Sequence, residues 1–523
     1  MADARKAPPD PTAEQRKSDA AAHRRAVADT LSRLVGEGWT EIATGRDTRG
    51  AERERATLAA LAAGAPFVWA AQLPRDPAGG RRGGVDLLVR TEAGYVPVLV
   101  VRHKVSDPGA GALTSPLDQP VPAAGRPDDA RRVRPQPRDQ LRLAHVLRLL
   151  RACGHADEGL AVGGVIGLDA DVVLWHDLSA PTWPAGRTAL EEYDTRFADR
   201  LAVATAAAGD GPALAFPSRV MECRGCPWWP VCGAALDAAR DVSLVVRGED
   251  AVGLRDMGVR TVDDLAALDL TETDLQLVAM PPGDAVALAR AWLAGLTVVR
   301  KVPEVTVPRA DVEVDVDMES FGDAGAYMWG TLLTVAGDAD VGQPPGYRAF
   351  VTWEPLPCDD EARSFAEFWQ WLTAIRHGAA ERGLTFRAYC YNELAENRWL
   401  ISSARRFAGK PGIPDERIVQ EFIDSDEWYD LFRGVQQHFL CSHGKGLKTI
   451  APVAGFQWRD AEASGENSMR WYRDAVGMTD GAIDEGQRRR ILEYNEDDVC
   501  ATMTLREWMS SSVVNDLPYV GDL

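Results

Sequence analysis

The sequence predicts a multidomain α/β protein. The chain has 523 residues, more than one ordinary hydrophobic core accommodates, so two to four domains are expected. Its second half contains strand-like and helix-like stretches in a regular order. A run of three closely spaced cysteines, followed by helical sequence up to about Leu296, separates that half from an N-terminal half of short strands and helices.

The second half begins with an acidic strand. Val312, Val314, Val316 and Met318 alternate with acidic residues, which predicts a strand with one apolar and one negative face. The elements expected after it are strands at 327–335 and 347–353, an amphipathic helix around 365–375, a strand at 386–391, a helix from about 393 and a long helix from about 484.

Two distant acidic motifs predict a metal site. Asp317 and Glu319 stand two apart on the strand, so their side chains share one face roughly 6.5–7 Å apart. Tyr494 and Asp498 stand four apart on the last helix and are therefore neighbours on its surface. Carboxylate oxygens select Mg²⁺ or Mn²⁺, and two such ions promote phosphodiester hydrolysis. Because Glu313 shares the face of Asp317, a solvated acidic edge strand is the alternative.

These motifs, in this order, resemble the ribonuclease-H-like 3′–5′ exonuclease superfamily, in the branch whose third motif is Tyr-x-x-x-Asp. The resemblance implies that Asp317, Glu319 and Asp498 bind the ions and that Tyr494 orients the attacking water. The second motif of the family usually ends in Asp, and Glu396 stands at that position here. Glu396 would complete the outer metal site, with Asp430 as the alternative. By the same resemblance, Lys448 would meet a phosphate.

The cysteine run predicts a second metal site. Cys223, Cys226 and Cys232 have the spacing C-x2-C-x5-C, and sulfur ligands select zinc or an iron–sulfur cluster. This spacing resembles the iron–sulfur staple of RecB-like nucleases. The resemblance implies a 4Fe–4S cluster, for which Cys153 is the candidate fourth ligand. Zinc, and a chance grouping of inert cysteines, are the alternatives.

The N-terminal half resembles a RecB-like nuclease core in part. The segment around Asp86 is similar to the first metal-binding motif of that family, and Gln140 to the start of its Gln-containing helix. Arg102, however, stands where the family has a metal-binding carboxylate, and a guanidinium cannot ligate Mg²⁺. We therefore expect a DNA-binding domain whose own nuclease chemistry is lost.

Basic residues of this half are the candidate phosphate contacts. Arg131, Arg132 and Arg138 belong to a Pro- and Arg-rich stretch that would contact the DNA backbone. A merely solvated basic run is the alternative.

The expected domain organisation has five parts. They are a disordered tail at 1–25, a RecB-like domain with the cluster at 26–240, a helix–hairpin–helix-like segment at 241–300, a linker at 301–309 and a ribonuclease-H-like exonuclease domain at 310–523. The whole arrangement resembles a bacterial family of RecB-like nucleases with an appended ribonuclease-H-like domain.

Composition constrains the partners. The net charge of −20 excludes global attraction of nucleic acid, so local basic patches must hold it. We expect no membrane span, no secretory signal and a cytoplasmic location. The expected function is a metal-dependent 3′–5′ exonuclease acting on single-stranded DNA ends in repair or processing, with a helicase as a candidate partner. An RNA exonuclease and a non-catalytic iron–sulfur scaffold are the alternatives.

Overall fold

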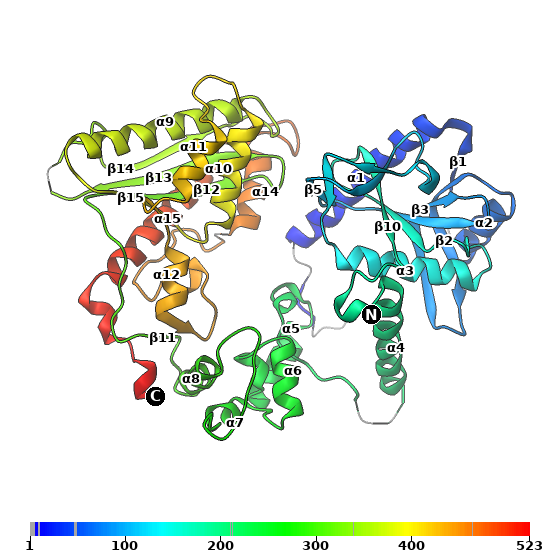
Figure 1. Ribbon diagram of the computed structural model, residues 1–523, viewed down its shortest axis with the longest axis horizontal. Coiled ribbons are helices and arrows are strands. Elements are labelled where there is room, and N and C mark those ends of the chain that lie inside the picture. Colours follow the sequence, from blue (N-terminus) through cyan, green and yellow to red (C-terminus); the bar gives the residue numbers. More distant parts are fainter. Residues whose placement is uncertain are drawn as a thin grey trace. The chain divides into compact units, whose positions relative to one another are not determined.

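The computed structural model describes residues 6–8, 11–45, 50–209, 211, 213–337, 339–462 and 464–523 (Figure 1). The chain divides into two compact units. The N-terminal unit comprises residues 9–216, and the C-terminal unit comprises residues 217–523 together with 1–8. Within the described residues, no helix has both the length and the apolar character that crossing a bilayer requires.

The N-terminal unit is built on an eight-stranded mixed sheet. Its strands are, in spatial order, β1 (Trp39–Glu41), β2 (Phe67–Asp76), β3 (Arg81–Arg90), β4 (Tyr95–Val100), β9 (Val162–Ile166), β10 (Val172–Asp177), β6 (Ala112–Pro116) and β7 (Arg126–Asp128). Within it, β3 and β4 pair antiparallel. A separate two-stranded sheet joins β5 (Ser106–Pro108) to β8 (Arg131–Val133).

Helices cover both faces of this sheet. Leu31 of α1 (Pro11–Val35) packs with Leu87 and Val98 on one face. The other face packs against α2 (Gly50–Ala62), α3 (Pro137–Ala152) and α4 (Ala189–Ala207). The segment around Gln140 is helical as α3, whose Leu143, Leu147 and Leu150 are fully buried at the helical spacing of a core face.

The expectation of a disordered tail at 1–25 is wrong over most of that range. Residues 1–5 and 9–10 lie outside the described residues, but α1 begins at Pro11. Asp19 of this helix pairs with Arg102, and His23 bonds the carbonyl of Gly167 at 3.1 Å. Low hydrophobicity at 11–25 suggested disorder, whereas the apolar residues Val27 and Leu31 anchor the whole helix.

The C-terminal unit begins with a small helical layer. Its helices are α5 (Trp229–Ala239), α6 (Glu249–Asp256), α7 (Val262–Ala266) and α8 (Pro282–Leu293). The expected order of short helix, glycine turn and second helix is present, since Gly258 between α6 and α7 has φ +89°. The boundary between the units falls at 216/217 instead of 240, because Leu236 packs into the core of this helical layer. The cysteine run therefore belongs to the C-terminal unit.

Residues 301–309 do not form a free linker. Lys301 N donates to His438 O at 2.7 Å, and Val305 is buried beside Leu431 and Val435. The preceding strand β11 (Val298–Arg300) pairs with β17 (Phe439–Cys441). The two prolines of this segment, which suggested a linker, prevent helix formation. The valines between them pack against the domain that follows.

A five-stranded sheet forms the rest of this unit. Its spatial order is β14 (Gly346–Val351), β13 (Ala326–Val335), β12 (Val312–Ser320), β15 (Phe386–Cys390) and β16 (Trp428–Asp430). β12 pairs antiparallel with β13 and parallel with β15, so it is the central strand. The remaining elements are α9 (Asp360–Glu381), α10 (Leu394–Arg406), α11 (Glu416–Ile423), α12 (Leu431–His438), α13 (Leu447–Ile450), α14 (Gly465–Ala475) and α15 (Glu485–Met509). The predicted order of three strands, helix, strand and helices is present, but the short strands β16 and β17 between the later helices were not predicted.

The two faces of β12 meet different partners. Val314, Val316 and Met318 pack on the α9 side with residues such as Phe365 and Phe368. Each such side chain contributes about 1.5–3 kcal/mol by its burial. The acidic side chains point to the opposite face, which α15 covers (Figure 1). The alternative of an acidic edge strand is therefore wrong, because β12 lies inside the sheet with both faces covered.

Candidate metal centre

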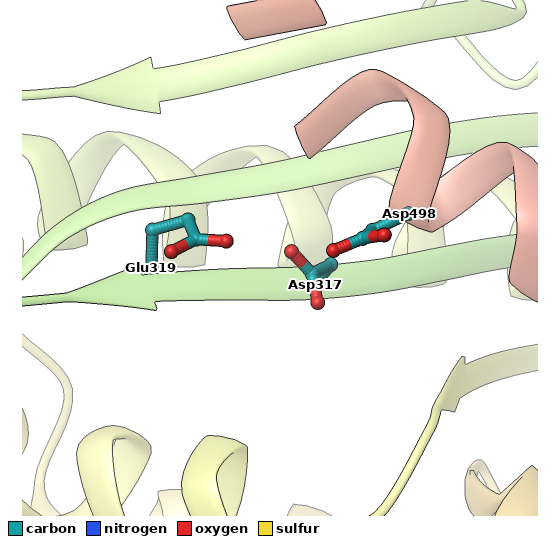
Figure 2. Close-up of side chains that lie close together, drawn as sticks. All are labelled: Asp317, Glu319 and Asp498. Atoms are coloured by element: carbon teal, nitrogen blue, oxygen red, sulfur yellow. The ribbon is translucent and has the colours of Figure 1, made fainter. Parts of the chain in front are cut away.

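Three carboxylates meet between β12 and α15. Asp317 and Glu319 extend from β12, and Asp498 extends from α15 toward them (Figure 2). One oxygen of each lies within 4.8 Å of the others. Glu319 and Asp498 are buried and Asp317 is half-buried. In the described part of the chain this is the one group of three histidine, cysteine or carboxylate side chains with that spacing.

Asn495 fixes the central carboxylate. Its Nδ2 donates to Asp317 Oδ2 at 2.7 Å, and its Oδ1 accepts from the Tyr347 hydroxyl at 2.8 Å. Gly330 on β13 lies opposite Asp317, and a Cβ there would meet Asn495 Oδ1 at 1.6 Å. A glycine is therefore required for the amide of Asn495 to reach Asp317.

The other two carboxylates are each held by one oxygen. Glu319 Oε2 accepts from Ser468 Oγ at 2.7 Å and from the Tyr327 hydroxyl at 3.3 Å. Asp498 Oδ1 accepts from Trp458 Nε1 at 2.6 Å. These hydrogen bonds fix Oε2 of Glu319 and Oδ1 of Asp498.

The electrostatics of the group favour a divalent cation. Burial, with the nearby charges of Asp498, Glu319 and Glu396, raises the pKa of Asp317 well above its ordinary value. Burial raises the pKa of Glu319 to about 8, and burial also raises the pKa of Asp498. A bound cation offsets the repulsion between these buried carboxylates. Hard oxygen donors fit Mg²⁺ or Mn²⁺. The residues present therefore fit these ions.

Tyr494 and Lys448 border the acidic group. Lys448 Nζ donates to the Tyr494 hydroxyl at 3.2 Å and lies 4.5 Å from the centre of its ring. Burial and the charges of Glu319 and Asp498 raise the pKa of Tyr494 far above the physiological range, so its hydroxyl keeps its proton. The predicted neighbours Tyr494 and Asp498 thus lie on the same side of α15, with Lys448 as the nearby cation.

Glu396 lies close to the group without belonging to it. It is buried on α10, and its Oε2 has no hydrogen-bond partner among the described residues. Burial raises its pKa to about 8, and its charge acts on Asp317. Asp430 serves another purpose, because its Oδ1 accepts from the backbone N–H groups of Asn392 and Phe432 at 2.8 and 2.9 Å.

A buried ion-pair network underlies the site. Arg506 on α15 is fully buried and donates to Asp315 Oδ2 at 2.7 Å and to Glu313. Burial raises the pKa of Asp315 to about 6 in spite of this partner. Although burial also raises the pKa of Glu313, hydrogen bonding from Arg309 and the charge of Arg506 bring it below its ordinary value. These two acids are therefore structural, and only Asp317 and Glu319 of the strand remain for metal ions.

The predicted cysteine ligands do not form a comparable group. Cys223, Cys226 and Cys232 are half-buried thiols around the start of α5, and they do not meet the spacing that the three carboxylates satisfy. Cys153 belongs to the N-terminal unit, where its Sγ donates to Leu150 O at 3.4 Å. The iron–sulfur cluster stays a prediction of the sequence.

The candidate phosphate contacts differ in their surroundings. Arg131 pairs with Asp128 at 2.8 Å and with Asp171, which neutralises its charge. Arg132 is exposed on the same strand. Arg138 lies on α3 at the edge of a cavity. Only part of the predicted basic run is thus available to an anion.

The residues that suggested a RecB-like core have protein partners. Asp86 Oδ2 accepts from Val100 N at 2.9 Å, and Arg24 lies 3.6 Å from its other oxygen. Burial raises the pKa of Asp86. The RecB-like assignment itself stays a prediction.

Several residues of the centre were not predicted from the sequence. Asn495 of α15, Trp458 of a loop and Ser468 of α14 donate hydrogen bonds to the carboxylates, and Tyr347 of β14 donates one to Asn495. Only Asn495 had a local signal, since it lies one turn before Asp498 on the face of Tyr494. The other three follow no spacing rule and meet the site only through the tertiary fold.

A comparison with protein-family models matches residues 411–510 to the family RNase_H_2 of the RNase H superfamily. The matched segment includes Lys448, Tyr494 and Asp498, whereas Asp317 and Glu319 precede it. No significant match was found among the curated proteins or the solved structures. The chain therefore carries a C-terminal RNase H-like domain, which is consistent with nuclease-type activity on a nucleic-acid substrate.

Proposed function

We propose that this protein is a metal-dependent 3′–5′ exonuclease that hydrolyses phosphodiester bonds at single-stranded DNA ends. The observation that carries the proposal is the convergence of Asp317, Glu319 and Asp498 from two elements far apart in the sequence. The match of residues 411–510 to the RNase H superfamily supports it.

The chain's own residues have distinct roles in this proposal. Asp317, Glu319 and Asp498 would hold one or two Mg²⁺ or Mn²⁺ ions, and Glu396 would complete the outer position. When bound, the ions would supply Lewis-acid stabilisation of charge on the phosphate and on the leaving oxygen. The protonated hydroxyl of Tyr494 would orient the attacking water, and Lys448 would meet a phosphate oxygen. Hydrolysis would join the water oxygen to phosphorus and break the P–O3′ bond.

The test is an end-labelled nuclease assay on matched DNA and RNA oligonucleotides with Mg²⁺, Mn²⁺, Ca²⁺ or EDTA. Labels at either end distinguish the direction of digestion. We expect shortening from the 3′ end of single-stranded DNA, with Mg²⁺ or Mn²⁺ only. Preferential digestion of RNA would favour the RNA exonuclease, and tight binding with no cleavage under any metal would favour the non-catalytic scaffold.

The matched control lies beside the site. Asp497 is the neighbour of Asp498 on α15, but it accepts from Arg459 Nε at 2.7 Å instead of joining the acidic group. Asp317→Asn and Asp498→Asn should lower the rate by about 10³-fold or more, whereas Asp497→Asn should change it by less than about fivefold. Undiminished digestion by the Asp317→Asn protein would refute the proposal.

We further propose, on the cysteine spacing alone, that Cys223, Cys226 and Cys232 hold a 4Fe–4S cluster. Protein purified without oxygen should be brown and contain iron, and Cys226→Ser should lose both properties. Zinc in place of iron, or no metal, would exclude the cluster.

A further inference from the structure

The N-terminal unit contains an open cavity of about 750 Å³ with an unusual lining. Its floor comes from β3 and β4, and its walls come from α3 and α4. Five arginines line it, and no aspartate or glutamate does. They are Arg82, Arg138, Arg142, Arg196 and Arg200. In a chain of net charge −20, such a concentration of positive charge needs an explanation.

Much of this positive charge is not neutralised by the protein. Arg82, Arg138 and Arg200 form no ion pair with any of the residues that the structure describes. Arg142 has only a weak partner, Asp139, whose oxygen lies 4.0 Å away. Arg196 alone is firmly paired, with Glu192 at 2.6 Å. The cavity is therefore a region of positive potential that is open to an anionic ligand.

The helices present these arginines in two rows. Arg138 and Arg142 stand four residues apart on α3, and Arg196 and Arg200 do the same on α4. Residues four apart lie about 5–6 Å from each other on one helix face. The two rows face a common space, so a linear anion with several charges fits better than a single small one.

An aromatic wall, formed by Tyr193 and Phe197 of α4, also lines the cavity. Tyr193 and Phe197 stack with ring centres 5.4 Å apart, and Arg81 covers Phe197 at 5.0 Å. His145 Nε2 donates to Arg82 O at 3.1 Å, and its Nδ1 accepts from the Tyr193 hydroxyl at 2.7 Å. These contacts hold the wall in place. Aromatic rings beside guanidinium groups are the usual surroundings of a nucleic-acid strand, because bases and sugars pack on the rings while phosphates meet the cations.

We propose that this cavity binds the phosphate groups of a single nucleic-acid strand through Arg138, Arg142 and Arg200, without a metal ion. The polymer is identified through the proposed function of the C-terminal unit, whereas the anion site rests on the cavity itself. The site replaces the predicted contacts of Arg131 and Arg132, which do not line the cavity.

The test measures binding of a fluorescent single-stranded oligonucleotide by anisotropy in EDTA, so that hydrolysis cannot interfere. The cavity variant is Arg138→Ser, Arg142→Ser, Arg200→Ser. The control variant is Arg33→Ser, Arg55→Ser, Arg75→Ser, which removes the same charge from exposed positions of the same unit outside the cavity. Thermal unfolding confirms that both variants fold.

We expect the cavity variant to bind at least about tenfold more weakly and the control variant to stay within about threefold of the parent. The slope of log K against log salt should become less steep by about 2, since each phosphate contact to a single strand contributes about 0.7. Equal weakening by both variants, or unchanged binding by the cavity variant, would overturn the proposal.

Unlabelled competitors identify the source of the phosphate. A single-stranded oligonucleotide should displace the probe, whereas a nucleoside monophosphate or inorganic phosphate at the same total phosphate concentration should not. Displacement by the mononucleotide alone would make the cavity a nucleotide site and overturn the proposal. A parent protein that binds the strand but never hydrolyses it would refute the proposed exonuclease and leave this site standing.

Discussion

Asn495 Nδ2 donates a 2.7 Å hydrogen bond to Asp317 Oδ2 across 178 positions of sequence. This contact couples the last helix to the central strand at the point where the acidic group forms. It also leaves Asp317 with one oxygen for a cation. Asn495 is thus a positioning residue of the proposed metal centre.

Removal of the Asn495 amide should weaken metal binding. We expect Asn495→Ala to raise the Mg²⁺ concentration needed for half-maximal activity by about 10–100-fold, because partners that orient metal ligands have effects of that size. Tyr347→Phe, which removes the hydroxyl that holds Asn495, should act in the same direction with a smaller effect. A Mg²⁺ titration of activity checks both, and an unchanged midpoint in Asn495→Ala would contradict the assignment.

Gly330 should not tolerate a side chain. A Cβ at this position would meet Asn495 Oδ1 at 1.6 Å, so Gly330→Ala must displace Asn495. We expect a loss of activity similar to that of Asn495→Ala and a destabilisation of about 1–3 kcal/mol. Gly283→Ala is the control, since nothing lies within 4 Å of its Cβ position. Urea unfolding and the nuclease assay measure the two effects, and wild-type behaviour of Gly330→Ala would be inconsistent with the contact.

Arg506 should be essential to the stability of the domain. Arg506→Met leaves Asp315 buried without its ion-pair partner and leaves Glu313 with Arg309 alone, which costs about 3–5 kcal/mol. Arg417→Met removes an exposed pair with Glu421 and should cost less than about 1 kcal/mol. Addition of Glu313→Gln and Asp315→Asn to Arg506→Met should recover most of the loss in urea unfolding. Failure of these changes to rescue would mean that Arg506 acts through packing instead of charge.

The metal-free protein should lose stability as the pH rises from about 5 to 8. Burial raises the pKa of Glu319 in the folded protein to about 8 from an ordinary value of 4.5. Between these values the folded state holds a proton that the unfolded state has released, so the free energy of unfolding falls with pH, by up to about 1.4 kcal/mol per unit for one group.

The pH effect is measured by thermal unfolding in EDTA and in Mg²⁺. Glu319→Gln should flatten the curve in EDTA, and Mg²⁺ should raise the unfolding temperature of the parent most at pH 8. The expectation would be contradicted if, in EDTA, the stability of the parent relative to Glu319→Gln increased between pH 5 and 8.

Glu396 and Asp430 should behave differently. Glu396→Gln replaces a buried carboxyl whose pKa is raised to about 8, so it should stabilise the metal-free protein at pH 8. It should also raise the Mg²⁺ requirement of the activity if Glu396 completes the outer site. Asp430→Ala should lower stability by about 1 kcal/mol, because it removes an acceptor for two backbone N–H groups. An altered Mg²⁺ requirement in Asp430→Ala alone would reverse the two roles.

Local patterns predicted the elements of the C-terminal domain well. Alternation in β12 and helical spacing in α9 depend only on near neighbours in sequence, so the strand, the helix and the apolar face of each were predictable. The tail and the linker were predicted wrongly for the same reason. Composition at 11–25 and 301–309 gave no sign of the distant residues, such as Arg102 and His438, to which those segments bind.

By itself, the sequence determined that Asp317 and Glu319 share a strand face and that Tyr494 and Asp498 share a helix face. Only the tertiary structure decided that these two faces meet, that β12 is central, and that Arg506 neutralises Glu313 and Asp315. It also decided that no cationic side chain among the described residues forms such a pair with Asp317. The reason is physical. Side-chain direction follows from backbone periodicity over a few residues, whereas the partner of a buried charge depends on packing between elements well over a hundred residues apart.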